Sequence, residues 1–223
     1  MNNNTKLSEE DIIAATTEHV KQLLAGEGSG HDWWHIYRVW NNAKSIAAHE
    51  QANLFVVELA ALLHDIGDHK FHNGDETVGP RMAYEWLQQL QVSKEVSNHI
   101  YDIIKEISFK GAGTSSEMST VEGCIVQDAD RLDAIGAIGI ARTFAYGGHK
   151  NRELYNPEVA PVLHDNFEAY KTSTAPTINH FYEKLLLLKD RMHTASAKKL
   201  AEQRHAYMEN FLSQFYAEWE GQR

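Results

Sequence analysis

The stretch VVELAALLHDIGD (residues 56–68) decides how the rest of the sequence is interpreted. Seven of the eight residues before His64 are apolar, so a helix here is apolar on nearly every side and is expected to be buried. It nevertheless ends in His64 and Asp65, with a further carboxylate at Asp68. Unpaired polar groups in a buried setting cost several kcal/mol, so these side chains are either paired with others or hold a cation.

The composition is that of a globular protein without disulfides. The 223 residues can form a sizeable core, and no apolar run approaches the ~20 residues of a membrane span. Residues 1–6 lack the apolar core of a secretory signal, and a single cysteine, Cys124, fits a reducing cytoplasm. The formal net charge of −10 argues against a broad nucleic-acid-binding surface. We therefore expect a cytoplasmic protein that binds neither nucleic acid nor membrane, while a homodimer stays open.

Apolar residues recur at helical spacing along most of the chain, and no alternation with a period of two stands out. Ser8 opens a capping box before the first predicted helix, Asp32 is the predicted N-cap of the second, and Ser93 begins a later one. No internal repeat or long linker divides the chain. The sequence therefore predicts an all-α fold, with one helical domain over residues 1–223.

The second half of the chain contains one long helical pattern and a helical C-terminal end. The long pattern runs from about residue 120 to residue 148 and includes Gly136 and Gly139. Each glycine inside a helix costs roughly 1 kcal/mol relative to alanine, so we expect close helix packing there. Two final helices are predicted over residues 177–192 and 194–219, and we expect them to pack as a C-terminal hairpin.

Three of the predicted helices carry side chains of the kinds that bind metal ions. These are His35, the adjacent His64 and Asp65, and the distant Asp130. Mixed imidazole and carboxylate ligands suit divalent ions such as Mn, Fe, Zn or Mg. Two histidines and two aspartates would leave coordination positions for water and substrate oxygens, as a catalytic site needs. Asp68, one helical turn after His64, is then the candidate to hold or deprotonate the attacking water.

Each of these residues also has a purely structural interpretation. A His-Asp pair occurs often by chance, and His35 alone can hydrogen-bond within a tryptophan-rich core. Residues 128–133 can form a solvated acidic face balanced by Arg131. Apolar residues enclose that segment on both sides, however, which a solvated face does not explain. The combined spacing therefore favours a metal site.

The chain resembles the HD-domain superfamily of metal-dependent phosphohydrolases, whose pattern is a histidine, a His-Asp pair and a distant aspartate. The flanking sequence is similar to one bacterial branch over about residues 28–148, and more loosely in the C-terminal third. The stretches that carry the resemblance are HDWWHIYRV (31–39), LHDI (63–66), VQDADRL (126–132) and GAIG (136–139). The resemblance implies an all-helical fold with an HD-type metal-binding core over residues 28–148, followed by C-terminal helices over 177–219.

The resemblance also implies an activity, namely hydrolysis of a phosphate ester or anhydride in a small phosphorylated substrate such as a nucleotide. Some similar proteins are pyrophosphohydrolases that act on nucleoside triphosphates. One divalent ion is implied, with Mn²⁺ favoured and Mg²⁺, Fe²⁺, Zn²⁺, Co²⁺ or Ni²⁺ left open. Its expected ligands are His35, His64, Asp65 and Asp130, and Asp68 matches an acidic residue that orients the attacking water and is often glutamate in relatives. The candidate substrate contacts are Arg38, Lys70, Lys110 and Arg131 for phosphate, and Asp133 for a ribose or for holding Arg131.

Two functions of other kinds stay open. The site can bind metal or nucleotide as a sensor without turnover. Asp68 argues against this, because a sensor does not need an acidic residue that orients water. A di-iron oxygenase would need further histidine ligands, and the candidates are His69, His72 and His99. We expect His31 and His69 to lie outside the ligand set. The aromatic side chains of Trp33, Trp34 and Tyr37 either stack on a base or belong to the core.

Overall fold

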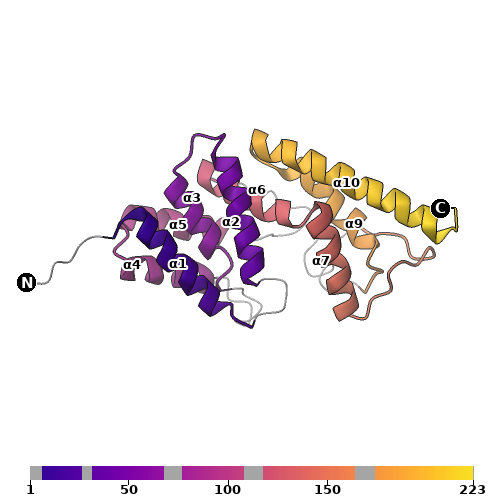
Figure 1. The fold of residues 1–223 in the computed structure, drawn as a ribbon, viewed down its shortest axis with the longest axis horizontal. Coiled ribbons are helices and arrows are strands. Elements are labelled where there is room, and N and C mark those ends of the chain that lie inside the picture. Colours follow the sequence, from indigo (N-terminus) through magenta and orange to yellow (C-terminus); the bar gives the residue numbers. More distant parts are fainter. Residues whose placement is uncertain (1–6, 27–31, 68–76, 108–117, 164–173, 223) are drawn as a thin grey trace, which may run out of the picture. The chain divides into compact units, whose positions relative to one another are not determined.

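A computed structural model describes residues 7–26, 32–67, 77–107, 118–163 and 174–222, and every regular element in these ranges is a helix (Figure 1). The predicted all-α class is confirmed. None of the helices in these ranges is both long and apolar enough to cross a bilayer. The described residues up to Ala129 form one compact unit and those from Asp130 onward form a second. The boundary falls inside a helix, and the single-domain organisation stays a prediction.

The first unit is organised around its most apolar helix. It contains α1 (Glu9–Leu23), α2 (Trp33–Ala47), α3 (Leu54–Leu63), α4 (Val78–Gln89), α5 (Lys94–Ile107) and most of α6 (Val121–Asp133). Seven of the ten residues of α3 are buried, and the helix contacts α1, α2 and α5. The expectation of a helix buried on nearly every side is confirmed. Its burial removes a large apolar surface from water, at about 25 cal/mol per Å².

The helices begin where the capping residues predict. The Ser8 hydroxyl accepts a hydrogen bond from the Asp11 amide at 3.1 Å, while the Asp11 carboxylate accepts one from the Ser8 amide. Asp32 Oδ1 accepts from the His35 amide at 2.9 Å, and Ser93 caps the start of α5 in the same way. Each cap contributes about 1 kcal/mol. The cap at Asp32 also fixes His35 in the first turn of α2.

Helix α3 ends at Leu63, earlier than expected, and His64 is its C-cap residue. Residues 64–67 form a turn whose backbone lies against the start of α4. A Cβ on Gly67 would lie 2.6 Å from Cα of Gly79, so the contact requires the absence of a side chain at this point. Asp68 lies outside the described residues, so its predicted place one turn after His64 and its role stay predictions.

The second unit consists of the end of α6, followed by α7 (Gly136–His149), α9 (Asn179–Glu183), the 3₁₀ helix η2 (Leu185–Arg191) and α10 (Ala195–Trp219). Helix α10 packs against α7 and η2. Aromatic rings fill the space between these helices. The fully buried Phe181 lies 6.1 Å from Phe144 and 5.9 Å from Phe211 between ring centroids.

Two predicted helices are interrupted. The pattern over residues 120–148 is divided between α6 and α7, because Gly136 adopts a φ of +74° that favours glycine. The helix expected over residues 177–192 is broken at Lys184, whose φ is −145°. Beyond it the chain continues as η2, whose three residues per turn place Leu185 and Leu188 on one buried face. The first arm of the expected hairpin is therefore not one continuous helix.

Close packing at Gly139 leads to a stability prediction. A Cβ at this position would overlap the backbone carbonyl of Ala134, which cannot move aside like a side chain. We expect Gly139→Ala to lower the free energy of unfolding by about 1–3 kcal/mol, and Tm by roughly 2–4 °C per kcal/mol. Gly148 lies in the same helix, and a methyl group added there would have no atom within 4 Å, so Gly148→Ala is the matched control and should be neutral or slightly stabilising. Thermal melts followed by circular dichroism measure both, and equal Tm values for the two variants would contradict the prediction.

Candidate metal centre

Three predicted metal ligands come together in the structure. One ligand atom from each of His35, His64 and Asp130 lies within 4.8 Å of the other two. His35 belongs to α2, His64 directly follows α3, and Asp130 belongs to α6. Asp130 is positioned by the preceding turns of its own helix, where the Ala129 carbonyl accepts a 3.4 Å hydrogen bond from Asn42 of α2.

His64 is oriented for metal binding by its own helix. Its Nδ1 lies 2.8 Å from the backbone oxygen of Ala61, and because a carbonyl can only accept, Nδ1 carries the proton. The lone pair is then on Nε2, which is buried and has no hydrogen-bond partner among the described residues. Leaving such a group unsatisfied costs about 1–3 kcal/mol. A divalent cation would satisfy it, and a backbone bond to the opposite nitrogen is the usual way to hold a ligating histidine.

His35 lies beside His64 and is almost completely buried, with 2% of its side chain exposed. The two imidazole rings meet edge to face, with centroids 5.4 Å apart. The Nε2 atom of His35 is also 3.9 Å from Oδ2 of Asp65, whose side chain is partly exposed. Asp65 is thus adjacent to His35, although it is not among the three residues that meet within 4.8 Å. Its role as the fourth ligand stays a prediction.

Two cationic candidates for phosphate binding lie in described helices. Arg38 is on α2, one turn after His35, and is partly buried. Arg131 directly follows Asp130, and its Nη1 donates to the backbone oxygen of Arg191 and lies 3.1 Å from Nε2 of His193. These contacts occupy one end of the Arg131 guanidinium within the second unit. The structural interpretation of Arg131 therefore gains support, and phosphate binding by either residue stays a prediction.

Asp133 is buried in an ion pair that sequence reasoning missed. Its Oδ2 accepts from Nη1 of Arg142 at 2.6 Å, and only 1% of the residue is exposed. Arg204 lies nearby and donates to the backbone oxygen of Leu132. Burial lowers the pKa of Arg204, while the negative charge of Asp133 acts in the opposite direction. No local motif marks Arg142, because the turn at Gly136 brings it back to the end of α6.

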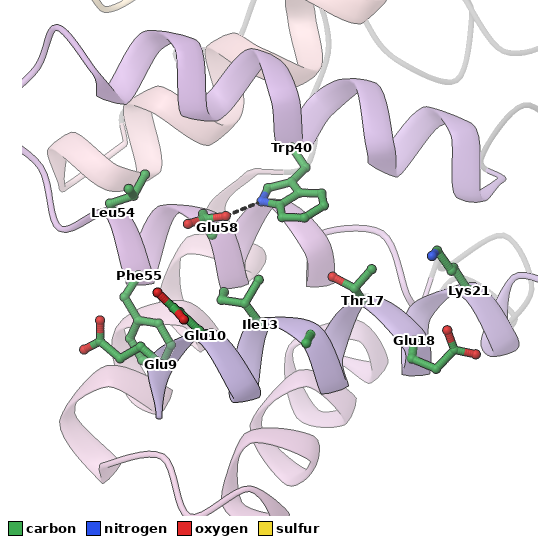
Figure 2. A pocket seen from close by; sticks show the side chains of 11 residues that line it. Glu9, Glu10, Ile13, Thr17, Glu18, Lys21, Trp40, Leu54, Phe55 and Glu58 are labelled. Atoms are coloured by element: carbon green, nitrogen blue, oxygen red, sulfur yellow. Dashed lines mark hydrogen bonds between the residues drawn. The ribbon is translucent and has the colours of Figure 1, made fainter. Parts of the chain in front are cut away.

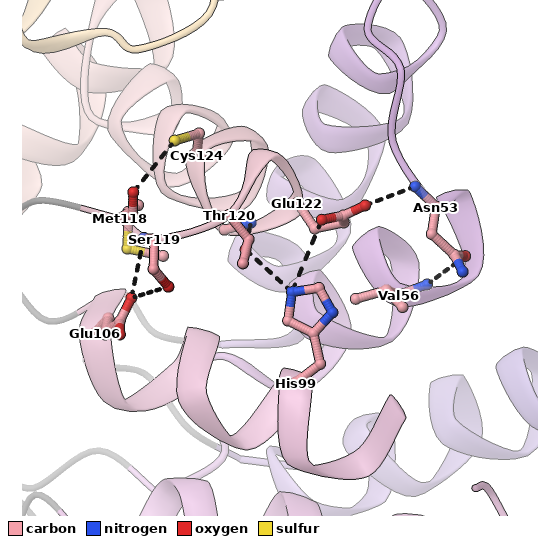
Figure 3. A network of polar contacts seen from close by, with 10 residues as sticks. Asn53, Val56, His99, Glu106, Met118, Ser119, Thr120, Glu122 and Cys124 are labelled. Atoms are coloured by element: carbon pink, nitrogen blue, oxygen red, sulfur yellow. Dashed lines mark hydrogen bonds and ion pairs between the residues drawn. The ribbon is translucent and has the colours of Figure 1, made fainter. Parts of the chain in front are cut away.

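The remaining candidates are divided between described and undescribed parts of the chain. His99 lies in a separate polar network, with its Nε2 3.0 Å from Thr120 Oγ1 and 3.8 Å from Glu122 (Figure 3). Glu122 in turn accepts from the Asn53 amide at 2.8 Å, so the network joins the starts of α3 and α6 (Figure 3). The candidates that lie outside the described residues are His31, Asp68, His69, Lys70, His72 and Lys110.

The aromatic residues at the start of α2 do not all belong to the core. Trp34 is 61% exposed and meets Tyr37, which is also exposed, at 5.9 Å between ring centroids. Trp33 is partly buried and lies under the ammonium group of Lys21, 5.0 Å from the ring centroid. For Trp34 and Tyr37 the core interpretation is therefore wrong, and base stacking stays a prediction.

Comparison with known proteins identifies the family. Residues 33–135 match the model of the HD domain, a range that contains all four predicted metal ligands. The uncharacterized protein YpgQ of Bacillus subtilis (strain 168) is 42% identical over 198 residues, which cover 87% of this chain and 87% of YpgQ. The chain belongs to the HD-domain superfamily. HD domains bind divalent metals, and the grouping of His35, His64 and Asp130 agrees with this.

Solved structures of HD proteins share the whole fold. An HD-superfamily hydrolase from Bacillus thuringiensis matches 96% of this chain and 99% of its own, with a TM-score of 0.77 and 46% identity. The crystal structure of B. subtilis YpgQ in complex with ADP matches 95% of this chain and 97% of its own, with a TM-score of 0.75 and 34% identity in the superposed structures. The similarity to HD proteins therefore extends beyond the metal-binding motif to the C-terminal helices.

Proposed function

We propose that this HD protein is a metal-dependent phosphohydrolase that cleaves a phosphate ester or anhydride of a nucleotide. The observation that carries the proposal is the buried Nε2 of His64, which has no partner among the described residues, on a histidine that groups with His35 and Asp130. Such an arrangement fits a divalent cation, for which Mn²⁺ is our first choice. The ADP complex of the related YpgQ supports a nucleotide as substrate. Within this class, a nucleoside triphosphate pyrophosphohydrolase is the narrower activity we favour.

The roles of the residues follow from their positions. His35, His64, Asp65 and Asp130 would hold the ion, which supplies positive charge at the phosphoryl oxygens and makes a water molecule more acidic. The Ala61 carbonyl holds the His64 ring in one orientation, and the Asp32 cap holds the backbone of His35. Asp68 is proposed to accept the proton of the attacking water.

Substrate contacts are proposed on the same elements. Arg38 is one turn from His35 on α2, so a phosphate near the metal ligands is within reach of a side chain of its length. Lys70 and Lys110 are the further proposed phosphate contacts. Arg131 and Asp133 remain candidates as well, and each also has a contact within the second unit, Arg131 with the backbone oxygen of Arg191 and Asp133 with Arg142.

An activity screen tests the proposal directly. The purified protein is stripped of metal with a chelator, reloaded separately with Mn²⁺, Mg²⁺, Fe²⁺, Zn²⁺, Co²⁺ or Ni²⁺, and incubated with nucleoside mono-, di- and triphosphates. We expect hydrolysis to require the metal and to be fastest with Mn²⁺. From a nucleoside triphosphate, release of pyrophosphate with a nucleoside monophosphate identifies cleavage between the α and β phosphates, whereas inorganic phosphate with a nucleoside diphosphate identifies cleavage between the β and γ phosphates.

The same samples separate the enzyme from the alternatives. If calorimetry detects nucleotide binding but no product forms after long incubation, the protein is a nucleotide sensor and not an enzyme. Metal analysis that finds two iron ions per chain would point instead to the oxygenase. One manganese ion per chain together with turnover agrees with the proposal.

A further inference from the structure

A second concave site lies in the first unit, formed by different residues from the metal cluster. It is a groove with a volume of about 620 Å³ among α1, α2 and α3 (Figure 2). One wall is a single face of α1 from Glu9 to Lys21, and the other consists of Trp40 of α2 and the first turns of α3. At a rise of about 1.5 Å per residue, the α1 wall is roughly 18 Å long. The groove is therefore elongated along α1.

The groove combines apolar and acidic side chains. Ile13, Leu54, Phe55 and the ring of Trp40 provide its apolar surface, and Leu54 is 48% exposed (Figure 2). Covering such side chains is favourable, at about 25 cal/mol per Å². An occupant with an apolar face of its own would gain this energy.

Carboxylates surround the apolar surface along its whole length. Glu9 and Glu10 lie at one end of α1, Glu18 lies two turns further on, and Glu58 projects from α3 in the middle (Figure 2). Acidic residues in the first turn stabilise a helix through its dipole, which accounts for Glu9 and Glu10. It accounts for neither Glu18 nor Glu58. Lys21 is the one cationic residue in the described lining of the groove.

Polar atoms in the middle of the groove have unused hydrogen-bonding capacity. Glu58 Oε2 accepts from Nε1 of Trp40 at 2.8 Å, while Oε1 has no partner among the described residues (Figure 2). Thr17 lies opposite on α1, and its Oγ1 is buried without a hydrogen bond to any described residue. A donor placed in the groove would pair with Oε1 of Glu58, whereas Oγ1 of Thr17 lies beneath the surface of the groove.

We propose that this groove binds a basic amphipathic helix of a partner protein. Glu10 and Glu18 are eight residues apart, which corresponds to about 12 Å along α1. Lysines seven residues apart on a partner helix are about 10.5 Å apart, so both can reach these carboxylates while apolar residues between them cover Ile13 and Phe55. The elongated shape favours a helix over a compact organic cation. The net charge of −10 further attracts a basic partner.

A designed peptide provides the probe. It is a fluorescein-labelled helix of leucine, lysine and alanine, with leucines at i, i+3, i+4 and i+7 and lysines seven residues apart on the flanks. One control peptide has the same composition in scrambled order, and another has glutamate in place of lysine. Fluorescence anisotropy with the full-length protein is expected to show saturable binding of the amphipathic lysine peptide alone. Because surface charges are screened by salt, binding should weaken between low and high ionic strength.

Matched charge reversals locate the binding site. We expect Glu10→Lys/Glu18→Lys to weaken binding about tenfold, since two favourable charge pairs become repulsive. Glu85→Lys/Glu95→Lys makes the same change in net charge at exposed positions on α4 and α5, and should leave the affinity nearly unchanged. Circular dichroism verifies that both variants are folded.

The outcomes are decisive in either direction. Selective loss in the groove variant supports the proposal. Equal weakening in both variants, or equal binding of the scrambled peptide, would show general attraction between a polycation and an acidic protein and would overturn it. Displacement of the peptide by spermidine at equal positive charge would show that a small organic cation suffices, and would overturn it as well. Peptide binding should persist in His64→Ala, so the result does not depend on the proposed hydrolase activity.

Discussion

His64→Ala is expected to bind Mn²⁺ at least about 100-fold more weakly than the unchanged protein. Removing even a residue that only hydrogen-bonds to a metal ligand lowers metal affinity about 10–100-fold. The substitution deletes the buried Nε2, which has no hydrogen-bond partner among the described residues. Calorimetric titration of the metal-free proteins with Mn²⁺ measures the effect. Hydrolysis of nucleotides should fall by a comparable or larger factor.

Thermal stability provides a second measurement for the same variant. A ligand that binds the folded state alone stabilises it by about 2.7 kcal/mol at a concentration 100 times its Kd. Mn²⁺ should therefore raise the Tm of the unchanged protein and leave that of His64→Ala nearly constant. His99→Ala is the matched control, since His99 contacts Thr120 and Glu122 and lies outside the cluster. If His64→Ala bound Mn²⁺ normally, or His99→Ala lost it equally, the assignment of the ligands would be wrong.

Asp133→Ala is expected to lower the free energy of unfolding by up to about 3 kcal/mol, because it leaves the partly exposed Arg142 without its buried partner. The remaining positive charge would lie close to Arg204, whose pKa is already lowered by burial. Urea denaturation of the unchanged and substituted proteins measures the loss. Such an effect would identify Asp133 as a structural residue of the second unit.

A double-mutant cycle separates the ion pair from a role in substrate binding. In the background of Arg142→Ala, the further change Asp133→Ala should cost much less than it does alone, since the pair is already broken. If Asp133 instead contacted a ribose, Asp133→Ala would raise KM while the free energy of unfolding changed little. That result would restore the alternative in which Asp133 faces the substrate.

The sequence predicted those features that depend on local patterns. The burial of α3 follows from its composition, and the starts of α1, α2 and α5 follow from Ser8, Asp32 and Ser93. The grouping of His35, His64 and Asp130 was predicted because each of these polar residues interrupts an apolar helical pattern. A polar side chain in such a place is either paired with another side chain or bound to a cation.

Features that depend on contacts between distant residues could not be predicted. The end of α3 at Leu63 is associated with the approach of Gly67 to Gly79, which no local pattern indicates. The pairing of Asp133 with Arg142 follows from the turn at Gly136, a residue that a periodic pattern assigns to the interior of a helix. In both places the helical pattern was extended across a residue at which the chain turns.

The contact between Gly67 and Gly79 has a consequence for how HD proteins of this kind can diversify. Since the two backbones touch, Gly67 and Gly79 fix the two ends of the sequence segment between them, residues 68–78, at one place. Insertions into such a segment cost little, because each doubling of loop length adds only about 0.6 kcal/mol. Asp68 and Lys70, the proposed water-orienting and phosphate-binding residues, belong to this segment. New substrate preferences can thus arise by exchanging it, while His64 keeps its place.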